Sequence, residues 1–581
     1  MKKIYFTTCL VVSLSIYVKA GEIKTTKKTS SHHNMPQTGC VNTVAHADLD
    51  IANVRARIMT GGDMWWDLVG YPQYEVPNGS GKHSMFAGAL WIGGLDPGGQ
   101  VKTACQTYRQ TGNDYWAGPI DTCDITAANC LVYDRLWKLN KSDVADFVNT
   151  GTTTVQDIID YPGNSPYAGN APLAPYFDNN ADGLYNYLDG DYPHFNLGTG
   201  TPDCCDMLHG DQCLWWVIND VGNLKTETNS PAICLEIRCQ AYAFSSSVAQ
   251  TANTTFYQYT MINLSGSTYT NCYFGQWADA DLGFYQDDFV GCHVGKGVGY
   301  CYNADAVDDP PDGYGATPPV IGVDILHGPI ADAGDGIDNN RNGIIDEPSE
   351  DIIMSKFMFY DNNNNPVNGN PSGFIEYYNY LKGHWRTGDP MTYGLNGAGG
   401  GTDYCDFMYP GLTDPTHPTE WTEETALHTG DDRRFLMSAG EFTMLPGEVN
   451  CISLAVIWAR AASGDNHASI PLLLYTDSIV QLMFDSCFTN FSVGMDQLTD
   501  GNIRGIIPNP FSEKTTIRFN NPKGEKYSFD LYDVNGSMVK RIENIKDNFL
   551  IVERENLKSG MYVFKLRSES GKINSGKLLV K

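Results

Sequence analysis

Short runs with the two-residue period of a β-strand, each ended by a turn signal, constrain this fold more than any other feature. Thr254–Leu264 and Cys451–Ala459 both alternate in this way. The chain has 581 residues with 59 Gly and 12% aromatic residues, which is typical of many strands joined by tight turns and not of a helical bundle. The sequence therefore predicts a mostly-β protein with a large β-sandwich-like body and a few short helices.

Local signals place one hairpin and three helices in the body. Asp96-Pro97-Gly98-Gly99 is a strong turn between the apolar run Met85–Gly94 and Val101–Tyr108, and it predicts that these two strands pair. Helical spacing of apolar residues follows three serines that can begin a helix. These serines are Ser142, Ser372 and Ser469.

The C-terminal segment repeats the strand pattern on a smaller scale. Its β-patterned runs are separated by turn signals such as Asp533-Val534-Asn535-Gly536, which predicts a small antiparallel sandwich. The runs are Thr515–Phe519, Tyr527–Tyr532, Ser537–Ile542, Phe549–Val552 and Met561–Leu566.

Four motifs give this segment a specific resemblance. They are Pro508-Asn509-Pro510, the turn Tyr532-Asp533-x-x-Gly536, the strand Leu557-x-x-Gly560-x-Tyr562, and the terminal Lys577-Leu578-Leu579-Val580-Lys581. With them, residues 506–581 resemble the type A C-terminal sorting domain of type IX secretion cargo, a small Ig-like β-sandwich. The main departure is Ile507, which stands where a tyrosine is commoner.

The resemblance implies where the protein is exported, but it implies no reaction or ligand. Residues 506–581 would bind the type IX secretion machinery, and the protein would be secreted or lie on the outer surface of a Gram-negative bacterium. Met1–Ala20 has the charged start, apolar run and small-residue end of a signal peptide, with cleavage after Ala20. Because no other run approaches the roughly 20 apolar residues of a membrane helix, we expect no transmembrane segment.

Charge separates the body from the C-terminal segment. Residues 501–581 hold 15 Lys and Arg and 9 Asp and Glu, a net charge of +6, whereas 24 and 59 in the first 500 residues give −35. Such an acidic body argues against nucleic acid as a partner and suits a protein that collects divalent cations. We expect a flexible lead over residues 21–45, a cysteine-containing β-rich body of one or two subdomains over 46–490, and a linker over 491–505.

Motifs in the body carry a second resemblance. Among them are Gly190-Asp191-Tyr192-Pro193 and Asp432-Arg433-Arg434-Phe435. They resemble a family of large secreted proteins that carry the same sorting domain. That family has no assigned reaction, so the resemblance implies location and architecture only.

Cysteine usage predicts disulfides. Of the 16 cysteines, Cys9 lies in the signal peptide, and the other fifteen lie between Cys40 and Cys487. An oxidising compartment favours disulfides, and an odd number leaves at least one thiol unpaired. A hairpin turning at Lys296-Gly297 would set Cys292 opposite Cys301 at disulfide distance, and we predict this pair. The alternative is that each pairs elsewhere.

Residues 178–189 have the spacing of a calcium-binding loop. Calcium takes six to eight oxygens, which come from side chains at positions one, three and five, the backbone carbonyl at seven and a side chain at twelve, with Gly at six. The alternative is a solvated turn rich in Asp and Asn. The predicted ligands are Asp178, Asn180, Asp182, Leu184 and Asp189.

A second loop resembles the calcium loops of thrombospondin-like repeats. Position twelve is Ser349, a poor ligand, so Asp335, Glu347 or Glu350 must complete the shell. The predicted ligands are Asp338, Asn340, Asn342, Ile344 and Asp346. For both loops we expect a structural Ca²⁺.

A third acidic group has three open interpretations. It could bind another structural cation, form a plain acidic loop, or supply a pair of catalytic carboxylates like those of glycoside hydrolases. Spacing alone does not choose between them. The group consists of Asp279, Asp281, Asp287 and Asp288.

Two functions are compatible with the sequence. The first is a calcium-stabilised protein with a binding, adhesive or surface-structural role, whose partner is a glycan or another surface ligand. The second is a secreted hydrolase of polysaccharide or protein that uses carboxylates. The sequence has neither the GxSxG motif of serine hydrolases nor the HExxH motif of zinc peptidases, which favours the non-enzymatic role.

Overall fold

The structure is a computed structural model. It describes residues 39–110, 112–167, 172–197, 204–246, 248–488, 503–507, 509, 511–519, 521, 524–532, 538–558, 560–569 and 573–580. The predicted signal peptide with its cleavage after Ala20, most of the predicted lead and most of the predicted linker lie outside the described residues.

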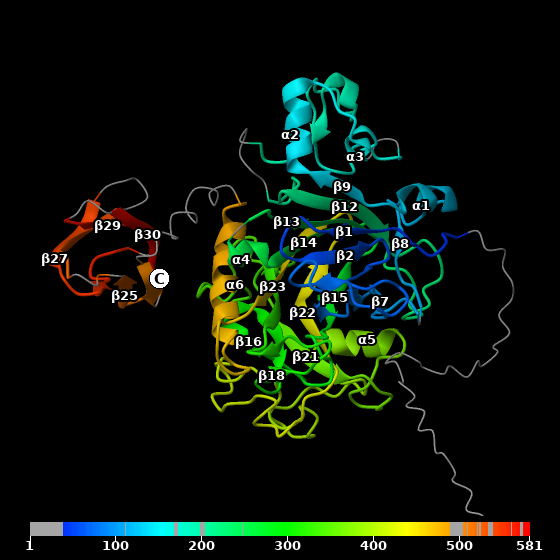
Figure 1. The fold of residues 1–581 in the computed structure, drawn as a ribbon. Helices are drawn as coiled ribbons and strands as arrows, with labels where there is room; N and C mark the ends of the chain where they lie inside the picture. The colour runs from blue at the N-terminus through cyan, green and yellow to red at the C-terminus, as the bar shows by residue number, and fades with distance from the viewer. Residues whose placement is uncertain are drawn as a thin grey trace, which may run out of the picture.

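The protein is mostly β, as predicted, and its body is built on two large antiparallel sheets (Figure 1). The ten-stranded sheet runs in the order β21-β22-β15-β6-β3-β2-β4-β5, with β1 paired to β2 and β7 to β6. Its strands are β1 (His46–Leu49), β2 (Arg55–Met59), β3 (Asp63–Met64), β4 (Tyr74–Glu75), β5 (His83–Met85), β6 (Ala87–Leu95), β7 (Val101–Cys105), β15 (Tyr269–Asp279), β21 (Lys356–Asp361) and β22 (Arg433–Met444). The predicted hairpin is confirmed, since Leu95 pairs with Val101.

The nine-stranded sheet runs in the order β16-β17-β20-β23-β14-β13-β12-β8, with β9 paired to β12. Its strands are β8 (Trp116–Ala117), β9 (Trp137–Asn140), β12 (Gln212–Asn219), β13 (Leu235–Ala243), β14 (Thr254–Asn263), β16 (Asp288–His293), β17 (Val298–Asn303), β20 (Val320–His327) and β23 (Val449–Ala459). Two short hairpins lie outside the large sheets. They pair β10 (Tyr176–Phe177) with β11 (Tyr192–Pro193), and β18 (Val307–Asp308) with β19 (Gly315–Ala316).

Alternation along the strands gives the nine-stranded sheet two different faces. On β14, Tyr257 and Tyr259 face the ten-stranded sheet and belong to the core between the sheets. The Nε1 of Trp65 donates to the Tyr257 hydroxyl at 2.8 Å and so links the two sheets. Phe256 points to the opposite face and belongs to a second core. A strand with both faces buried must carry apolar side chains at successive positions, as this one does.

Helices cover part of the second face. Leu473 and Val480 of α6 pack with Ala455 and Ile457 of β23. Ser469 precedes α6 as predicted, but its hydroxyl donates to the Pro318 carbonyl at 2.7 Å and does not cap the helix. The α-helices are α1 (Ala127–Tyr133), α2 (Lys141–Thr150), α3 (Gln156–Ile159), α4 (Ala249–Ala252), α5 (Phe374–Leu381) and α6 (Ile470–Asp485), and the 3₁₀ turns are η1 (Tyr187–Asp189) and η2 (Val294–Lys296).

The C-terminal unit is a small β-sandwich with a core of its own. Its three-stranded sheet is ordered β24-β25-β28 and its four-stranded sheet β27-β26-β29-β30. Phe529, Phe564 and Leu566 lie in its core, whose described members all fall between residues 511 and 580. The strands are β24 (Ile503–Ile507), β25 (Lys514–Phe519), β26 (Tyr527–Tyr532), β27 (Met538–Ile545), β28 (Phe549–Glu553), β29 (Gly560–Ser568) and β30 (Ile573–Val580).

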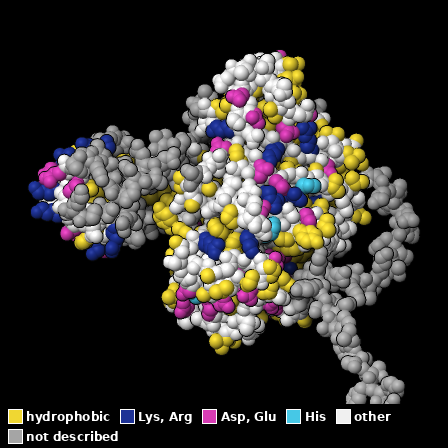
Figure 2. All heavy atoms as spheres, in the orientation of Figure 1, with side chains coloured by type: hydrophobic (Ala, Val, Ile, Leu, Met, Phe, Trp, Pro, Cys, Tyr) yellow, Lys and Arg dark blue, Asp and Glu magenta, His cyan; other side chains and the backbone are white. Residues whose placement is uncertain are grey.

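The charge contrast between the two parts is visible at the surface. Figure 2 shows many Asp and Glu side chains on the visible face of the body, with a row low on that face, beside fewer Lys and Arg, whereas Lys and Arg outnumber Asp and Glu on the visible part of the C-terminal unit. Among the described residues, no helix is both long enough and apolar enough to cross a membrane.

Four disulfides join distant parts of the body. Their Cα–Cα distances are between 4.8 and 6.1 Å, inside the usual range for disulfides. The pairs are Cys40–Cys130, Cys123–Cys234, Cys204–Cys487 and Cys205–Cys451. Cys40 is buried, so residues 39–45 are fastened to the body at this point, although we expected them within the flexible lead.

The predicted disulfide between Cys292 and Cys301 is wrong. The turn between β16 and β17 is longer than expected, because η2 occupies it and the innermost pair is His293 with Val298. That register sets Cys292 against Gly299, so the two cysteines are diagonal neighbours, which lie about 7–8 Å apart and not directly opposite each other. Both are buried free thiols.

Candidate cation loops, an acidic cluster and a pocket

The first predicted cation loop follows β10 and returns to β11. Asp178 accepts from three backbone amides: its Oδ1 from Ala181 N at 2.6 Å and from Asp182 N at 3.3 Å, and its Oδ2 from Gly183 N at 2.7 Å. Asn180 Oδ1 accepts from Asp182 N at 3.0 Å, and Asp182 Oδ1 accepts from Leu184 N at 2.8 Å. Gly183 has φ +78°, which a residue with a side chain rarely adopts.

The second predicted loop repeats four of these hydrogen bonds at the same positions. Asp338 Oδ1 accepts from Asn342 N at 3.0 Å and its Oδ2 from Gly343 N at 2.9 Å. Asn340 Oδ1 accepts from Asn342 N at 3.1 Å, and Asn342 Oδ1 accepts from Ile344 N at 2.8 Å. Gly343 also has positive φ, at +94°. Each set of bonds turns the side chains at positions one, three and five toward the centre of its loop.

The acidic residues at the end of each loop and just after it have different roles, which the sequence did not distinguish. In the first loop the predicted ligand Asp189 accepts from the Asn186 side chain at 2.6 Å. The buried Asp191 accepts from Asn179 N and from Asn186 N, both at 2.8 Å, and so fixes both ends of the loop. Leu184 is exposed, which leaves its backbone carbonyl as the group it can offer.

In the second loop, Glu347 is the acidic residue that reaches the loop centre. Its Oε1 accepts from the side-chain amides of Asn340, at 2.9 Å, and Asn342. Glu350 is buried and accepts from Asn339 N at 2.6 Å, the anchoring role that Asp191 has in the first loop. The predicted ligand Asp346 instead accepts from the amide of Gly336 at 3.1 Å.

The third acidic group divides in two. Asp279 and Asp281 lie together with Asp432, and one oxygen of each carboxylate lies within 4.8 Å of the other two. Asp287 and Asp288 belong to a separate group. Asp432 was missed because it follows a long connection and reaches Asp279 only through strand pairing between β15 and β22.

Arg434 and Tyr108 hold Asp279 in place. The Tyr108 hydroxyl donates to Asp279 Oδ2, and Arg434 donates to the same oxygen at 3.3 Å and to Asp432 Oδ1 at 2.9 Å. Burial raises the pKa of Asp279 to about 7, although the Arg434 charge opposes that shift. Burial and the charges of Asp279 and Asp432 raise the pKa of Asp281 well above its ordinary value.

Asp287 and Asp288 share their surroundings with Asp308, a residue without any local sequence signal. Asp288 Oδ2 accepts from Leu282 N at 3.0 Å, and Asp287 Oδ2 accepts from Asp309 N at 3.2 Å. Burial, together with the charges of Asp308 and Asp309, raises the pKa of Asp287 to about 7. Burial also raises the pKa of Asp308 to about 6.

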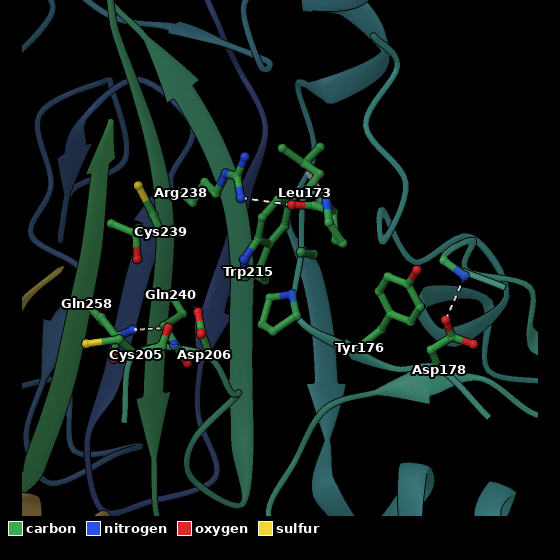
Figure 3. A pocket seen from close by; sticks show the side chains of 15 residues that line it. Leu173, Tyr176, Asp178, Cys205, Asp206, Trp215, Arg238, Cys239, Gln240 and Gln258 are labelled. Atoms are coloured by element: carbon green, nitrogen blue, oxygen red, sulfur yellow. Dashed lines mark hydrogen bonds between the residues drawn. The ribbon is translucent and has the colours of Figure 1, made fainter. Parts of the chain in front are cut away.

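A pocket of about 450 Å³ opens between the outer face of the nine-stranded sheet and the first cation loop (Figure 3). Trp215, Gln240 and Gln258 stand side by side on one wall, because Trp215 pairs with Gln240 and Gln240 with Gln258 across three strands. Asp178 and Gly183 of the loop contribute to the other wall. The pocket therefore combines an aromatic ring with amide groups, and its size is that of a small-molecule site.

The comparisons with known proteins identify the C-terminal unit. Residues 505–581 match the family model described as the secretion system C-terminal sorting domain. No curated protein significantly matches the chain. The segment that matches is the two-sheet unit described above, so its architecture and its sequence agree.

Among solved structures, the likenesses are weak. CopC from Methylosinus trichosporium OB3b is 21% identical over 14% of this chain and 89% of its own, with a TM-score of 0.11. A polysaccharide lyase is 10% identical over 59% of this chain and 34% of its own, with a TM-score of 0.17. The BSP domain of a biofilm associated protein is 9% identical over 95% and 84%, with a TM-score of 0.13. At these TM-scores none of the three supports a conclusion about this chain.

Proposed function

Because the chain is type IX secretion cargo that carries its own C-terminal sorting domain and is exported from the cell or to its surface, we propose that its body is a calcium-stabilised protein that binds a glycan. The sorting domain accounts for where the protein acts, and the proposal concerns what its body binds.

The matched hydrogen bonds of the two loops carry the calcium proposal. Two segments about 160 residues apart in sequence adopt one pattern, in which the side chains at positions one, three and five converge. Backbone amides hold one oxygen of most of these side chains and leave lone pairs free for an ion. Calcium prefers such carboxylate and amide oxygens, and extracellular calcium is abundant enough for weak sites.

The pocket carries the glycan proposal. Its walls include the Trp215 ring, the Gln258 amide and the exposed Asp206 carboxylate, a mixture that suits a ligand with apolar ring faces and many hydroxyl groups. The Gln240 amide is already engaged, since its Nε2 donates to the Met207 carbonyl at 3.0 Å and its Oε1 accepts from His209 N at 3.2 Å. The buried Gln258 Oε1 has no hydrogen-bond partner within the described structure and is available as an acceptor.

The first loop links calcium to the glycan. Asp178 and Gly183 line the pocket, whereas the second loop contributes none of the described lining residues. An ion in the first loop would therefore hold one wall of the pocket in position. An ion in the second loop would stabilise the body without touching the ligand.

The two loops supply a matched pair of test variants at position five, Asp182→Ala and Asn342→Ala. We expect chelation to lower the melting temperature of the wild-type secreted form, because an ion at 100 times its Kd stabilises by about 2.7 kcal/mol. Each variant should lose part of that sensitivity. On a glycan array with calcium present, Asp182→Ala should lose the binding that Asn342→Ala keeps.

Asp206→Ala provides the control for the pocket itself. It should weaken glycan binding without changing the response to chelator, since Asp206 lines the pocket outside the loop. Identical melting curves with and without chelator would refute calcium in both loops. Equal glycan binding by Asp182→Ala and the wild type would refute the link between the first loop and the ligand.

A further inference from the structure

We propose that Asp279, Asp281 and Asp432 form a third divalent-cation site, separate from both loops and independent of the function proposed above. It lies where β15 ends and β22 begins, so residues from two segments of the chain build it. One carboxylate oxygen of each residue lies within 4.8 Å of the other two. Oxygens that share an ion at 2.3–2.6 Å are separated by at most about 5 Å, so the spacing fits a single ion.

An unpartnered buried oxygen points to a ligand at this place. Asp279 is only 1% exposed, and its Oδ1 has no hydrogen-bond partner within the described structure. Its Oδ2 is already occupied by the Tyr108 hydroxyl and by Arg434. A buried carboxylate oxygen without a partner is costly, and buried polar atoms are almost always satisfied by protein, water or an ion.

The charge balance also favours a cation. Arg434 is the basic side chain that pairs with Asp279 and Asp432, and when all three carboxylates are ionised, as they are around a cation, a single guanidinium balances only one of their charges. Asp281 takes part in no hydrogen bond or ion pair through its side chain in the described part of the chain. A divalent ion would neutralise the remaining charge and supply a partner to both Asp279 and Asp281.

The ligand atoms select the class of ion. All three ligands are carboxylate oxygens, which suit hard cations such as Ca²⁺, Mg²⁺ and Mn²⁺, whereas zinc favours sites with histidine or cysteine. Asp281 and Asp432 are partly exposed, so water can complete the shell and an ion can enter. We choose Ca²⁺ as the probe because the protein is exported.

The test counts calcium ions bound by the full secreted chain in equilibrium dialysis. We expect Asp281→Asn to bind one ion fewer than the wild type, with the remaining ions held as before. Asp281 is the best position to change because its side chain supports no other described group, so the neutral isostere should fold. Asp431→Asn is the matched control: it removes a neighbouring exposed charge outside the cluster and should bind as many ions as the wild type.

A stability measurement separates a lost ligand from a damaged fold. In chelator, Asp281→Asn should melt at or above the wild-type temperature, because it relieves repulsion between empty carboxylates, and calcium should raise its melting temperature less. If Asp281→Asn binds as many ions as the wild type, the third site is refuted. If both loop variants also bind as many ions as the wild type while Asp281→Asn binds one fewer, the loops fail and this site stands.

Discussion

At the residue scale, the carboxylates inside this protein differ in how far their oxygens are satisfied by hydrogen bonds. Asp191, Glu350 and Asp220 accept from backbone amides and so hold turns in place. Asp220 accepts from three consecutive residues and also pairs with Lys225 at 2.6 Å. Asp287 is different, because its Oδ1 is buried without a partner and acidic residues surround it.

Asp287 should make stability depend on pH. Its pKa rises from 3.8 in a model peptide to about 7 in the fold, so the folded state holds the proton more tightly than the unfolded chain. This stabilisation is present below about pH 4 and is lost as pH rises towards 7. Thermal unfolding at pH 5 and pH 8 should show a decline with pH that is smaller in Asp287→Asn. Asp312→Asn, which changes an exposed carboxylate outside this group, is the control. An equal decline in wild type and Asp287→Asn would contradict the prediction.

At the element scale, the adjacent Cys204 and Cys205 fasten different parts of the body to one point. Cys204 reaches Cys487, just beyond α6, and Cys205 reaches Cys451 on β23. Helix α6 is therefore tied to the segment that leads into β12, next to the pocket wall that contains Cys205. The remaining seven cysteines of the body are buried thiols.

This arrangement predicts the number and reactivity of thiols. Alkylation of the denatured, non-reduced secreted protein should label seven cysteines, and alkylation of the native protein should label almost none, because all seven are buried. Peptide mapping should link Cys204 with Cys487 and Cys205 with Cys451. Removing the first pair with Cys204→Ser and Cys487→Ser should cost roughly 2–4 kcal/mol in urea unfolding. A peptide that links Cys292 with Cys301 would contradict this arrangement.

At the scale of the whole molecule, the body and the C-terminal unit have separate cores. The described core of the C-terminal unit contains residues 511 to 580 only, and the two cores of the body contain none of them. The two parts also differ in charge, and the described cysteines all lie in the body. Each part therefore has what it needs to fold without the other.

Removal of residues 506–581 should therefore leave a folded body that is not exported. The truncated protein should keep the melting transition and the calcium response of the body, because the cores and loops that produce them are intact. Immunoblots of periplasm and medium should find it in the periplasm. Truncated protein in the medium at the wild-type level would contradict the role of the sorting domain.

The sequence by itself determined the features that arise from local patterns. The two-residue period identified β14 and β23, and the turn at Asp96–Gly99 set the hairpin of β6 and β7. The motifs of residues 506–581 identified the sorting domain. The order of residues in each predicted cation loop also indicated the turn that positions one, three and five share, because a loop of about twelve residues is closed by its own turns. It did not indicate the contacts that the structure gives to Asp189 and Asp346.

Only the tertiary structure decided which distant residues meet. Strand pairing between β15 and β22 brings Asp432 to Asp279 and Asp281, while Asp287 and Asp288 belong to another group despite being closer in sequence. A turn two residues longer than predicted, occupied by η2, was enough to separate Cys292 from Cys301. Register across three strands lines up the pocket wall. These arrangements depend on sheet order and register, which are set by packing between distant segments. The spacing of residues along the chain therefore does not predict them.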